Sequence, residues 1–439
     1  MGGAGASGLP AEPVPRRATG VVSGTMSGQG VRRFWPGGLP SVSGGRAARQ
    51  GFYYYAFQGW EIARADPPFS STTIDDVVRS ETAIRQLNEL PPTSAILRGL
   101  GNQLLRAEAV ASSRIEGLDL SIRGLAEAAF DPKLGSANAP SVLGNIRAIN
   151  EALRIAADSR RITVDSILGI HRELFAGTRS EGTAGRLRTT QNWIGRGDNP
   201  LRATFIPVPE DSVRPLLVDL CRFIERDDLP AIVQAAIAHA QFETIHPFED
   251  GNGRVGRSLV QLIWRRRDLA PFYVPPISLV LSSSYDSYVT GLTAYRAHRE
   301  DEWTGVLSRA AAVAADGARH LIADVDALKA RWRELAKPRA GSAAAKLIEL
   351  LPLYPVFDLK SATEFLELSD EAARLGIERL EGAGVVKEVT KRKWGRAWES
   401  VGLFALLDGF ERKLATGPGS PRARPASRDT ASKRATGRV

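Results

Sequence analysis

Residues 230–264 place two apolar helical patterns on either side of a loop that cannot itself be helical. Apolar residues recur at helical spacing in both arms, at Ile232, Val233, Ala236, Ile237 and Ala240 before the loop and at Val255, Leu259, Leu262 and Ile263 after it. Two glycines and an asparagine in the loop favour turn and left-handed conformations. The free N–H groups and positive dipole end of the second helix would face that loop. The segment therefore predicts an anion site, most naturally a cradle for phosphates.

Four charged or titratable side chains belong to this predicted cradle. Arg254 and Arg257 lie three residues apart in the first turn of the second helix, so they share a face and can grip phosphate oxygens. The helix dipole disfavours each cation there by roughly 0.3–1 kcal/mol, which suggests that a bound polyanion compensates both. Asp250 can supply an oxygen ligand to a magnesium ion that bridges phosphates. His246 is the one group of the loop whose reference pKa suits proton transfer near neutrality.

Two other interpretations of these residues fit less well. Residues 251–256 match the dinucleotide pattern Gly-x-Gly-x-x-Gly, but they follow a helix rather than a strand, and the acidic residue expected about 20 positions further on is missing. His239 and His246 stand seven residues apart near Asp250, without cysteine partners or the His-Glu-x-x-His spacing of a zinc site. The phosphate cradle is therefore the favoured interpretation.

Helical patterns dominate most of the remaining chain, so the predicted fold class is mainly α. Helical spacing predicts helices at 74–90, 96–113, 140–159, 163–177, 211–228 and 230–245, with Ser141, Asp165 and Asp211 near three of their starts. Residues 185–211 interrupt the helices with two β-prone runs parted by the turn residues 195–200, which predicts a β-hairpin. The aromatic residues 52–69 are compatible with a short strand or with a packed arm.

A different pattern begins near residue 341. Three short helical patterns at 343–355, 360–370 and 371–384 precede two strand-like runs that are parted by the basic turn 391–396. This order is typical of a winged helix-turn-helix.

Both ends of the chain are basic and poor in apolar periodicity. Residues 1–50 and 417–439 each carry a net charge of +5, which leaves the rest of the chain at −1 of the total +9. We therefore expect two disordered tails rather than a basic nucleic-acid-binding body. One cysteine, Cys221, permits no internal disulfide. No secretory signal or apolar run of membrane-spanning length is present, so a cytoplasmic protein is expected.

The loop resembles the signature of the Fic (Fido) family, His-x-Phe-x-Asp/Glu-Gly-Asn-Gly-Arg-x-x-Arg, whose fixed positions are all met between His246 and Arg257. The resemblance implies a Fic-type helical bundle with a β-hairpin flap, and transfer of AMP from ATP to a Ser, Thr or Tyr hydroxyl of a target protein or of the chain itself. It implies His246 as the base, Asp250 as the magnesium ligand and Phe248 as the anchor of the loop. It also implies a nucleotide site made of Gly251, Asn252, Gly253, Arg254, Val255, Gly256, Arg257 and Tyr288. The flap residues that would dock the target are Thr189, Thr190, Gln191, Asn192 and Trp193.

A second element resembles the inhibitory motif that one subclass of the family carries upstream of the catalytic domain. Ser112 and Glu116, followed by Gly117, match its Ser/Thr-x-x-x-Glu-Gly/Asn pattern. The resemblance implies that Glu116 pairs with Arg257, so that this arginine cannot bind the γ-phosphate and ATP sits unproductively. We therefore expect an autoinhibited enzyme.

The resulting domain prediction is a tail at 1–50, a helical region with the inhibitory motif at 51–135, a catalytic domain at 136–335, a winged helix-turn-helix at 341–412 and a tail at 413–439. The alternative function is a DNA-binding transcriptional regulator with a nucleotide-sensing helical domain. Its motivation is a cluster of cations in the predicted wing, namely Lys387, Lys391, Arg392, Lys393 and Arg396. The C-terminal domain would contact DNA or protein, no membrane partner is expected, and a homodimer stays open.

Overall fold

The computed structural model describes residues 30–36, 51–89, 95–158, 161–195, 200–389 and 396–415. The chain divides into two compact units, which are described separately below. The first comprises residues 1–58 and 191–209, and the second comprises residues 59–190 and 210–439. The predicted domain boundaries at 135 and 341 both fall inside the second unit and stay predictions.

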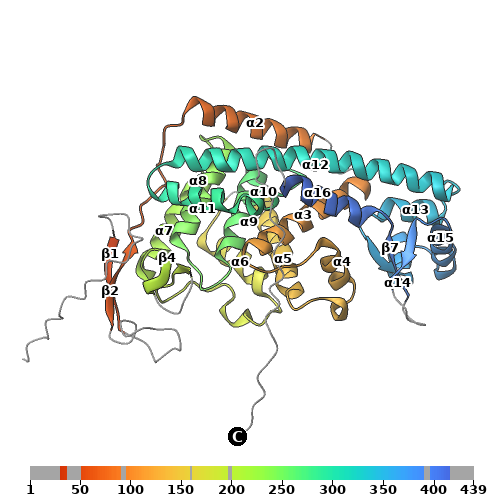
Figure 1. Ribbon diagram of the computed structural model, residues 1–439, viewed down its shortest axis with the longest axis horizontal. Coiled ribbons are helices and arrows are strands. Elements are labelled where there is room, and N and C mark those ends of the chain that lie inside the picture. Colours follow the sequence, from red (N-terminus) through yellow and green to blue (C-terminus); the bar gives the residue numbers. More distant parts are fainter. Residues whose placement is uncertain are drawn as a thin grey trace, which may run out of the picture. The chain divides into compact units, whose positions relative to one another are not determined.

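The first unit contains two small antiparallel sheets (Figure 1). Strand β1 (Gly30–Trp35) pairs with β2 (Phe52–Phe57), and β3 (Ile194–Gly195) pairs with β4 (Ala203–Phe205). The N–H of Phe57 donates to the carbonyl of Ile206 at 2.9 Å, which joins the two sheets. Aromatic rings reinforce the junction, with ring centroids 5.4 Å apart both for Trp35–Trp193 and for Phe57–Phe205.

Two expectations are corrected or refined here. The expected disorder of residues 1–50 is wrong for Gly30–Trp35, which form β1 because β2, far along the chain, supplies both backbone partners and aromatic packing. The predicted hairpin exists, but its strands are only two and three residues long, and its turn at 196–199 lies outside the described residues. Of the aromatic segment 52–69, residues 52–57 form a strand, and the rest contains neither helix nor strand.

The helical part of the second unit agrees with the predicted mainly α class. Its helices are α2 (Ser71–Asn88), α3 (Ala95–Ile115), α4 (Ile122–Phe130), α5 (Ala139–Asp158), α6 (Val164–Phe175), α7 (Glu210–Ile224), α8 (Ala231–Ile245), α9 (Asn252–Arg266), α10 (Ile277–Ser283), α11 (Tyr285–Arg296) and α12 (Glu300–Ala336). Helix α8 is buried along its whole length and forms the centre of the core. Helices α2 and α12 run side by side (Figure 1).

Helix starts lie slightly before the residues that the sequence suggested. Thr163 caps α6, because its side chain accepts the N–H of Ser166, so Asp165 lies within the first turn. Helix α5 begins at Ala139 and α7 at Glu210, which places Ser141 and Asp211 inside the first turns as well. No described helix is both long and apolar enough to cross a membrane.

The C-terminal elements follow the predicted order with two additions. They are α13 (Ala343–Leu350), β5 (Val356–Asp358), α14 (Leu359–Leu366), α15 (Asp370–Gly382), β6 (Val386–Glu388), β7 (Ala397–Ser400) and α16 (Leu403–Ala415). The three strands form an antiparallel sheet in the order β5-β7-β6. Strand β5 and helix α16 were not predicted, and residues 390–395 of the predicted wing lie outside the described residues.

Candidate active site

His246 ends helix α8 in a left-handed conformation, with φ 49° and ψ 63°. Its N–H still donates to the carbonyl of Phe242 at 2.8 Å, so the chain turns sharply at this residue. The turn carries Phe248 into the core, where it is fully buried. The predicted helix end and loop anchor are therefore both present.

The side chain of Asn252 holds the loop together from the inside. Its Oδ1 accepts the N–H of Phe248 at 2.8 Å, and its Nδ2 donates to the carbonyl of Phe248 at 2.8 Å. The same Nδ2 lies 3.2 Å from Nδ1 of His246, so Asn252 also contacts the imidazole. Because its side chain is used in this way, Asn252 can offer a ligand only its backbone.

Helix α9 begins directly after Gly251, which has a φ of 80°. A Cβ at this position would lie 2.7 Å from Leu174 Cδ2, so both conformation and space require glycine. The first N–H groups of α9 have no partner inside the helix and point toward the loop. This is the geometry of an anion site at a helix N-terminus.

Two predicted phosphate contacts are not favoured by this geometry. The N–H of Val255 already donates to the carbonyl of Gly251 at 3.0 Å, because this is the first hydrogen bond of the helix, and its side chain is fully buried. Gly256 faces the core, where a Cβ would lie 2.6 Å from Glu243 Oε1. Both residues therefore serve the packing of α9.

The two arginines of the motif are both buried, Arg254 with 3 % and Arg257 with 2 % of its surface exposed. Arg254 has Nη2 3.6 Å from Asp250 Oδ1 and its guanidinium over the ring of Phe175. Its Nε has no hydrogen-bond partner among the described residues. A buried guanidinium with an unused donor at a helix N-terminus is suited to an anionic ligand.

Arg257 is held by the segment that was predicted to be inhibitory. Its Nε donates to Ser112 Oγ, and its Nη2 donates to the carbonyl of Ser112 and to Glu116 Oε1, each at 2.8 Å. Its Nη1 lies 3.5 Å from the hydroxyl of Tyr288. Burial lowers the pKa of Arg257, but Glu116 and Tyr288 outweigh burial and leave that pKa raised.

Glu116 also lies against the first turn of α9. A Cβ on Gly253 would overlap Glu116 Oε1 and would lie 2.9 Å from Arg257 Nη1. The carboxylate therefore occupies the position where the helix N-terminus and Arg257 together favour an anion.

His246 does not keep the pKa that its residue type suggests. Burial lowers the pKa of His246 to about 3, and the positive charges of Arg188 and Arg296 contribute to the decrease. The imidazole is therefore neutral at pH 7 and can accept a proton.

Two residues that the sequence analysis missed support the loop. Arg188 is buried and donates through Nε to the carbonyl of His246 at 2.9 Å and through Nη2 to that of Ile245 at 3.3 Å, while its own N–H donates to the carbonyl of Pro247. His171 contacts the loop at Asp250 and stacks on Phe248. A histidine among the apolar positions of its helix was a signal for His171, whereas nothing near Arg188 in the sequence indicated its role.

A buried polar group lies behind Arg257. The hydroxyl of Tyr288, a residue of the predicted nucleotide site, is 3.0 Å from His239 Nε2 and 3.5 Å from Arg257 Nη1. Burial raises the pKa of Glu243 to about 7, although Arg257 acts in the opposite direction. Burial also lowers the pKa of His239 to about 3.

Asp250 lies at the rim of the loop with 65 % of its side chain exposed. Among the described residues, no group of three or more His, Cys, Asp or Glu side chains could hold a metal ion by itself. Mg²⁺ commonly binds through one or two carboxylates together with substrate phosphates. Asp250 beside an anion cradle fits that donor set.

The predicted flap residues fall on both sides of the division between the units. Thr189 and Thr190 end a segment of the second unit, and Arg188 Nη1 donates to the carbonyl of Thr190 at 3.0 Å. Gln191, Asn192 and Trp193 belong to the first unit, where Gln191 Nε2 donates to the carbonyl of Pro207 at 3.1 Å. All five precede β3, so none is part of a strand.

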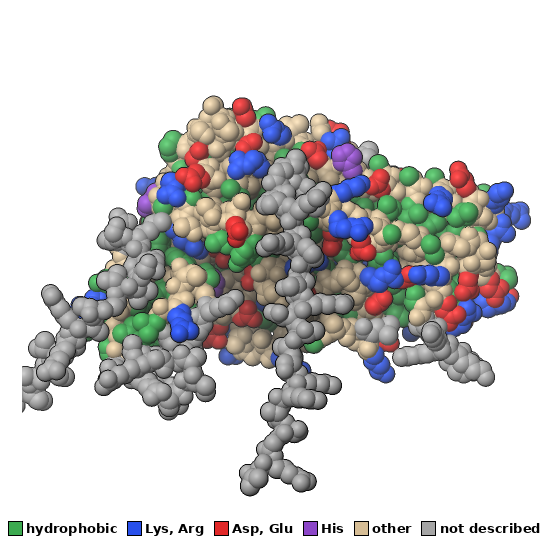
Figure 2. Space-filling model, in the orientation of Figure 1, with side chains coloured by type: hydrophobic (Ala, Val, Ile, Leu, Met, Phe, Trp, Pro, Cys, Tyr) green, Lys and Arg blue, Asp and Glu red, His purple; other side chains and the backbone are tan. Residues whose placement is uncertain are grey.

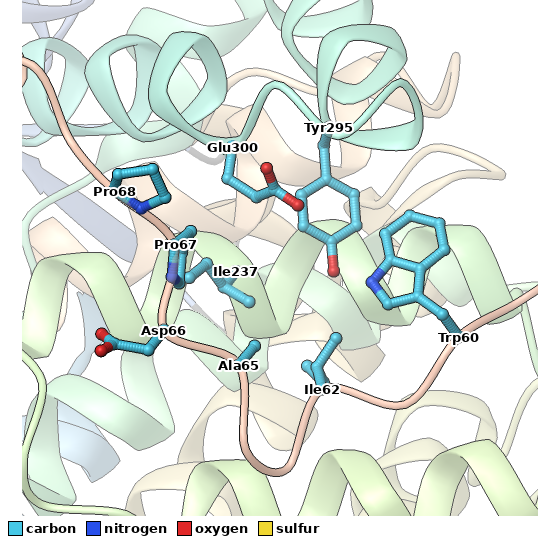
Figure 3. A pocket seen from close by; sticks show the side chains of 9 residues that line it. All are labelled: Trp60, Ile62, Ala65, Asp66, Pro67, Pro68, Ile237, Tyr295 and Glu300. Atoms are coloured by element: carbon cyan, nitrogen blue, oxygen red, sulfur yellow. The ribbon is translucent and has the colours of Figure 1, made fainter.

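A separate hollow of about 260 Å³ lies between the chain at 60–68 and helices α8, α11 and α12 (Figure 3). Its charged lining residues are Asp66 and Glu300, and its rings are those of Trp60 and Tyr295. Two carboxylates would repel phosphates, so this hollow is no alternative nucleotide site.

The fold and the loop define a helical domain with an anion-binding helix N-terminus, a neutral histidine and a carboxylate that occupies the anion position. Residues 161–264 match the Fic/DOC family and residues 72–154 match the Fic/DOC family N-terminal region. The first matched segment contains the loop, and the N-terminal matched segment contains Glu116.

Curated relatives match about a third of the chain. The protein adenylyltransferase fic-1 of Caenorhabditis elegans is 35% identical over 133 residues, which are 30% of this chain and 24% of that protein. The protein adenylyltransferase Fic of Nematostella vectensis is 31% identical over 147 residues, 32% of this chain and 31% of that protein. The chain therefore matches only about a quarter to a third of the length of these relatives.

Solved structures of similar fold include a Fic family protein from Desulfovibrio desulfuricans, with a TM-score of 0.48 and 21% identity, covering 77% of this chain and 99% of that one. Residues 134–508 of Fic-1 from C. elegans align with a TM-score of 0.46 and 22% identity, covering 57% of this chain and 73% of that one.

Proposed function

We propose that the protein is an adenylyltransferase that moves AMP from ATP to a Ser, Thr or Tyr hydroxyl of a target protein or of itself. The observation that carries this proposal is the start of α9, where a helix N-terminus and the buried Arg257 hold a carboxylate in the position of a phosphate. The names of the curated relatives support the same activity.

The neutral imidazole of His246 would accept the proton of the target hydroxyl. The hydroxyl oxygen would form a bond to the α-phosphorus of ATP, the bond from that phosphorus to the bridging oxygen would break, and pyrophosphate would leave. In this assignment Arg188 and Asn252 keep the histidine in place by their contacts to its carbonyl and to Nδ1.

The phosphates would lie against the backbone of Gly251, Asn252 and Gly253, with Arg254 gripping them and Arg257 fixing the γ-phosphate. Buried charged donors at a helix N-terminus support these roles. Asp250 would hold Mg²⁺, which would neutralise phosphate charge when bound. Tyr288 would act on the γ-phosphate through Arg257 rather than on the adenine, because its hydroxyl lies beside that arginine.

Autoinhibition by Ser112 and Glu116 is part of the proposal. Three hydrogen bonds from Arg257 to these two residues support it, since a guanidinium that is engaged in this way cannot bind the γ-phosphate. ATP would then bind weakly or in an unproductive geometry. Loss of the Glu116 carboxylate would release the arginine.

The segment Thr189, Thr190, Gln191, Asn192 and Trp193 would dock the target by strand addition, which suits an extended chain next to a short hairpin. We place the reaction in the cytoplasm and leave a homodimer open.

The C-terminal elements are proposed to form a winged helix-turn-helix that contacts protein. The order of helices and the three-stranded sheet support that assignment. Contact with DNA is less favoured, because three basic residues within the described part of this region have carboxylate partners. Arg374 pairs with Glu371 and Glu378, Arg396 with Glu381 and Glu388, and Lys387 with Glu399. Basic and acidic side chains are intermingled over the face that Figure 2 shows.

The test is mass spectrometry of purified protein that has been incubated with ATP and Mg²⁺, alone and with a cell lysate. We expect added AMP with Glu116→Gly, less with the wild type and none with Glu116→Gly/His246→Ala. His320→Ala, a change at an exposed histidine of α12, is the matched control and should leave the result of Glu116→Gly unchanged. No AMP on any protein would reject the proposed activity.

A further inference from the structure

His171 lies on α6, outside the loop motif, and joins three segments that meet beneath the loop. It is 1% exposed, and its ring stacks on Phe248 with centroids 3.8 Å apart and planes 9° apart. The ring of Phe175 packs against it at an angle of 63°, with centroids 4.9 Å apart. The side chain therefore has one orientation.

The hydrogen bonds of His171 also define its tautomer. The N–H of Gly185 donates to Nδ1 at 2.9 Å, and an N–H can only donate, so Nδ1 carries no proton. The ring proton is on Nε2, which donates to the carbonyl of Asp250 at 3.1 Å. One neutral ring thus connects Asp250 to the segment that continues to Arg188.

Asp250 Oδ1 accepts the N–H of Gly251 at 2.6 Å and lies 3.6 Å from Arg254 Nη2, but 65% of the side chain is exposed, so its direction also depends on the backbone that His171 holds. An exposed carboxylate loses conformational freedom when it binds a metal ion, and a fixed backbone reduces that cost. We propose that His171 is a positioning residue, which fixes the direction of the Asp250 carboxylate toward a magnesium ion on the phosphates. This inference rests on the proposed function, because it deepens the role of Asp250.

The test measures binding of ATP by calorimetry with and without Mg²⁺, using Glu116→Gly as the parent. His171→Phe keeps a ring against Phe248 and removes both hydrogen bonds. We expect the Mg²⁺ concentration at half-saturation to rise about tenfold, equivalent to about 1.4 kcal/mol, with metal-free ATP binding unchanged. His171→Gln, which restores an N–H donor, should recover part of this loss. His320→Phe is the matched control.

Two outcomes would overturn the proposal. One is an unchanged Mg²⁺ dependence in His171→Phe. The other is an equal loss of ATP binding with and without Mg²⁺, which would show a structural role only. If His171→Phe does not fold, His171→Gln is the test variant. The proposal then requires that His171→Gln weakens ATP binding only in the presence of Mg²⁺. Binding without AMP transfer in the parent would reject the proposed function and leave this inference standing.

A second observation concerns the C-terminal elements, which contact the inhibitory segment on both sides of Glu116. On α3, Gln103 Nε2 donates to the carbonyl of Pro352 at 2.7 Å, and Arg114 Nη2 lies 3.3 Å from Glu411 Oε2 on α16. On α4, Arg123 pairs with Glu399 of β7.

These contacts connect helix α3, which carries Ser112 and ends just before Glu116, to the C-terminal elements. Those elements contribute no residue to the loop 246–257. A cavity of about 430 Å³ separates α10 from the ends of α3 and α16, and Arg114 and Glu411 are among its lining residues. Glu411 Oε1 is buried without a hydrogen-bond partner in the described part of the chain. The geometry points to α16 as a restraint that keeps Glu116 on Arg257, a role that rests on the proposed inhibition.

Loss of the restraint should raise ATP affinity. Because partly exposed ion pairs contribute about 0.2–1 kcal/mol, we expect Glu411→Gln to raise ATP affinity roughly two- to fivefold, and more in combination with Arg123→Ala. Lys413→Ala, on the same helix and 74% exposed, is the matched control. In a Glu116→Gly parent the same changes should have no effect.

The proposal is wrong if the double variant leaves ATP affinity unchanged, or if its effect persists when Glu116 is absent. A thermal unfolding curve on each variant separates restraint from general destabilisation. AMP transfer is not needed for this measurement, so the proposed activity is tested separately.

Discussion

Arg257 donates to Glu116 Oε1 at 2.8 Å, and the same oxygen lies directly over the Cα of Gly253. The carboxylate thereby meets both a buried guanidinium and the positive end of α9. Removing the Glu116 carboxylate from this pair therefore tests whether the N-terminus of α9 binds an anion.

Replacing Glu116 by glycine should strengthen ATP binding and AMP transfer by at least about tenfold. The physical reason is that a competing carboxylate leaves and Arg257 becomes available, a gain of about 1.4 kcal/mol or more. Calorimetry with ATP and incorporation of labelled AMP measure the two effects. Glu89→Gly, at an exposed helix end, is the control and should change neither. Equal ATP affinity in the wild type and Glu116→Gly would contradict inhibition.

The pH profile should reflect the low pKa of His246. With that pKa at about 3, the ring is neutral well below pH 6.5. We expect kcat/KM of Glu116→Gly to stay level from pH 8 down to about pH 5, and to fall only below that. The folded pKa lies below the unfolded one, so this group stabilises the fold above about pH 6.5 and progressively less as the pH falls toward 3. An acid limb centred near pH 6.5 would contradict this prediction.

Asn252→Ala should damage the loop more than the helix that follows it. The change removes the partners of the Phe248 N–H and carbonyl and the contact to His246. Leaving buried backbone groups unsatisfied costs about 1–3 kcal/mol. We expect a lower midpoint of urea unfolding together with loss of AMP transfer. Full transfer in a stable Asn252→Ala protein would show that the loop does not need this side chain.

Glu108→Gln should stabilise the protein at alkaline pH. Burial raises the pKa of Glu108 to about 7, while hydrogen bonds from Ser278 oppose the increase. Because this carboxyl pKa is raised on folding, Glu108 contributes its full stabilisation below about pH 4.5, where it is protonated in both states. That contribution is lost as the pH rises through 7. The variant should therefore exceed the wild type by about 1–3 kcal/mol at pH 8.5 and by less at pH 5. Urea denaturation at both values measures the difference, and Glu89→Gln serves as the exposed control.

Local patterns in the sequence determined the helices and the loop. Helical spacing and turn residues predicted α8, the loop and α9. A helix forms its hydrogen bonds between near neighbours and buries one face, which produces a periodic pattern of apolar residues in the sequence. A strand whose pairing depends on a distant segment shows only a weak local pattern of this kind. Strand β1 was missed for this reason, since residues 36–51 separate it from β2 and the first 50 residues are rich in glycine.

The sequence alone also predicted which groups would form the site, through the loop motif and the resemblance that suggested Glu116 as the partner of Arg257. Only the tertiary structure decided how they are held. It brought Glu116 within hydrogen-bonding distance of Arg257 across 141 residues, placed Arg188 and His171 beneath the loop and lowered the pKa of His246. Burial and long-range pairing depend on which segments pack together, and no local spacing records that choice.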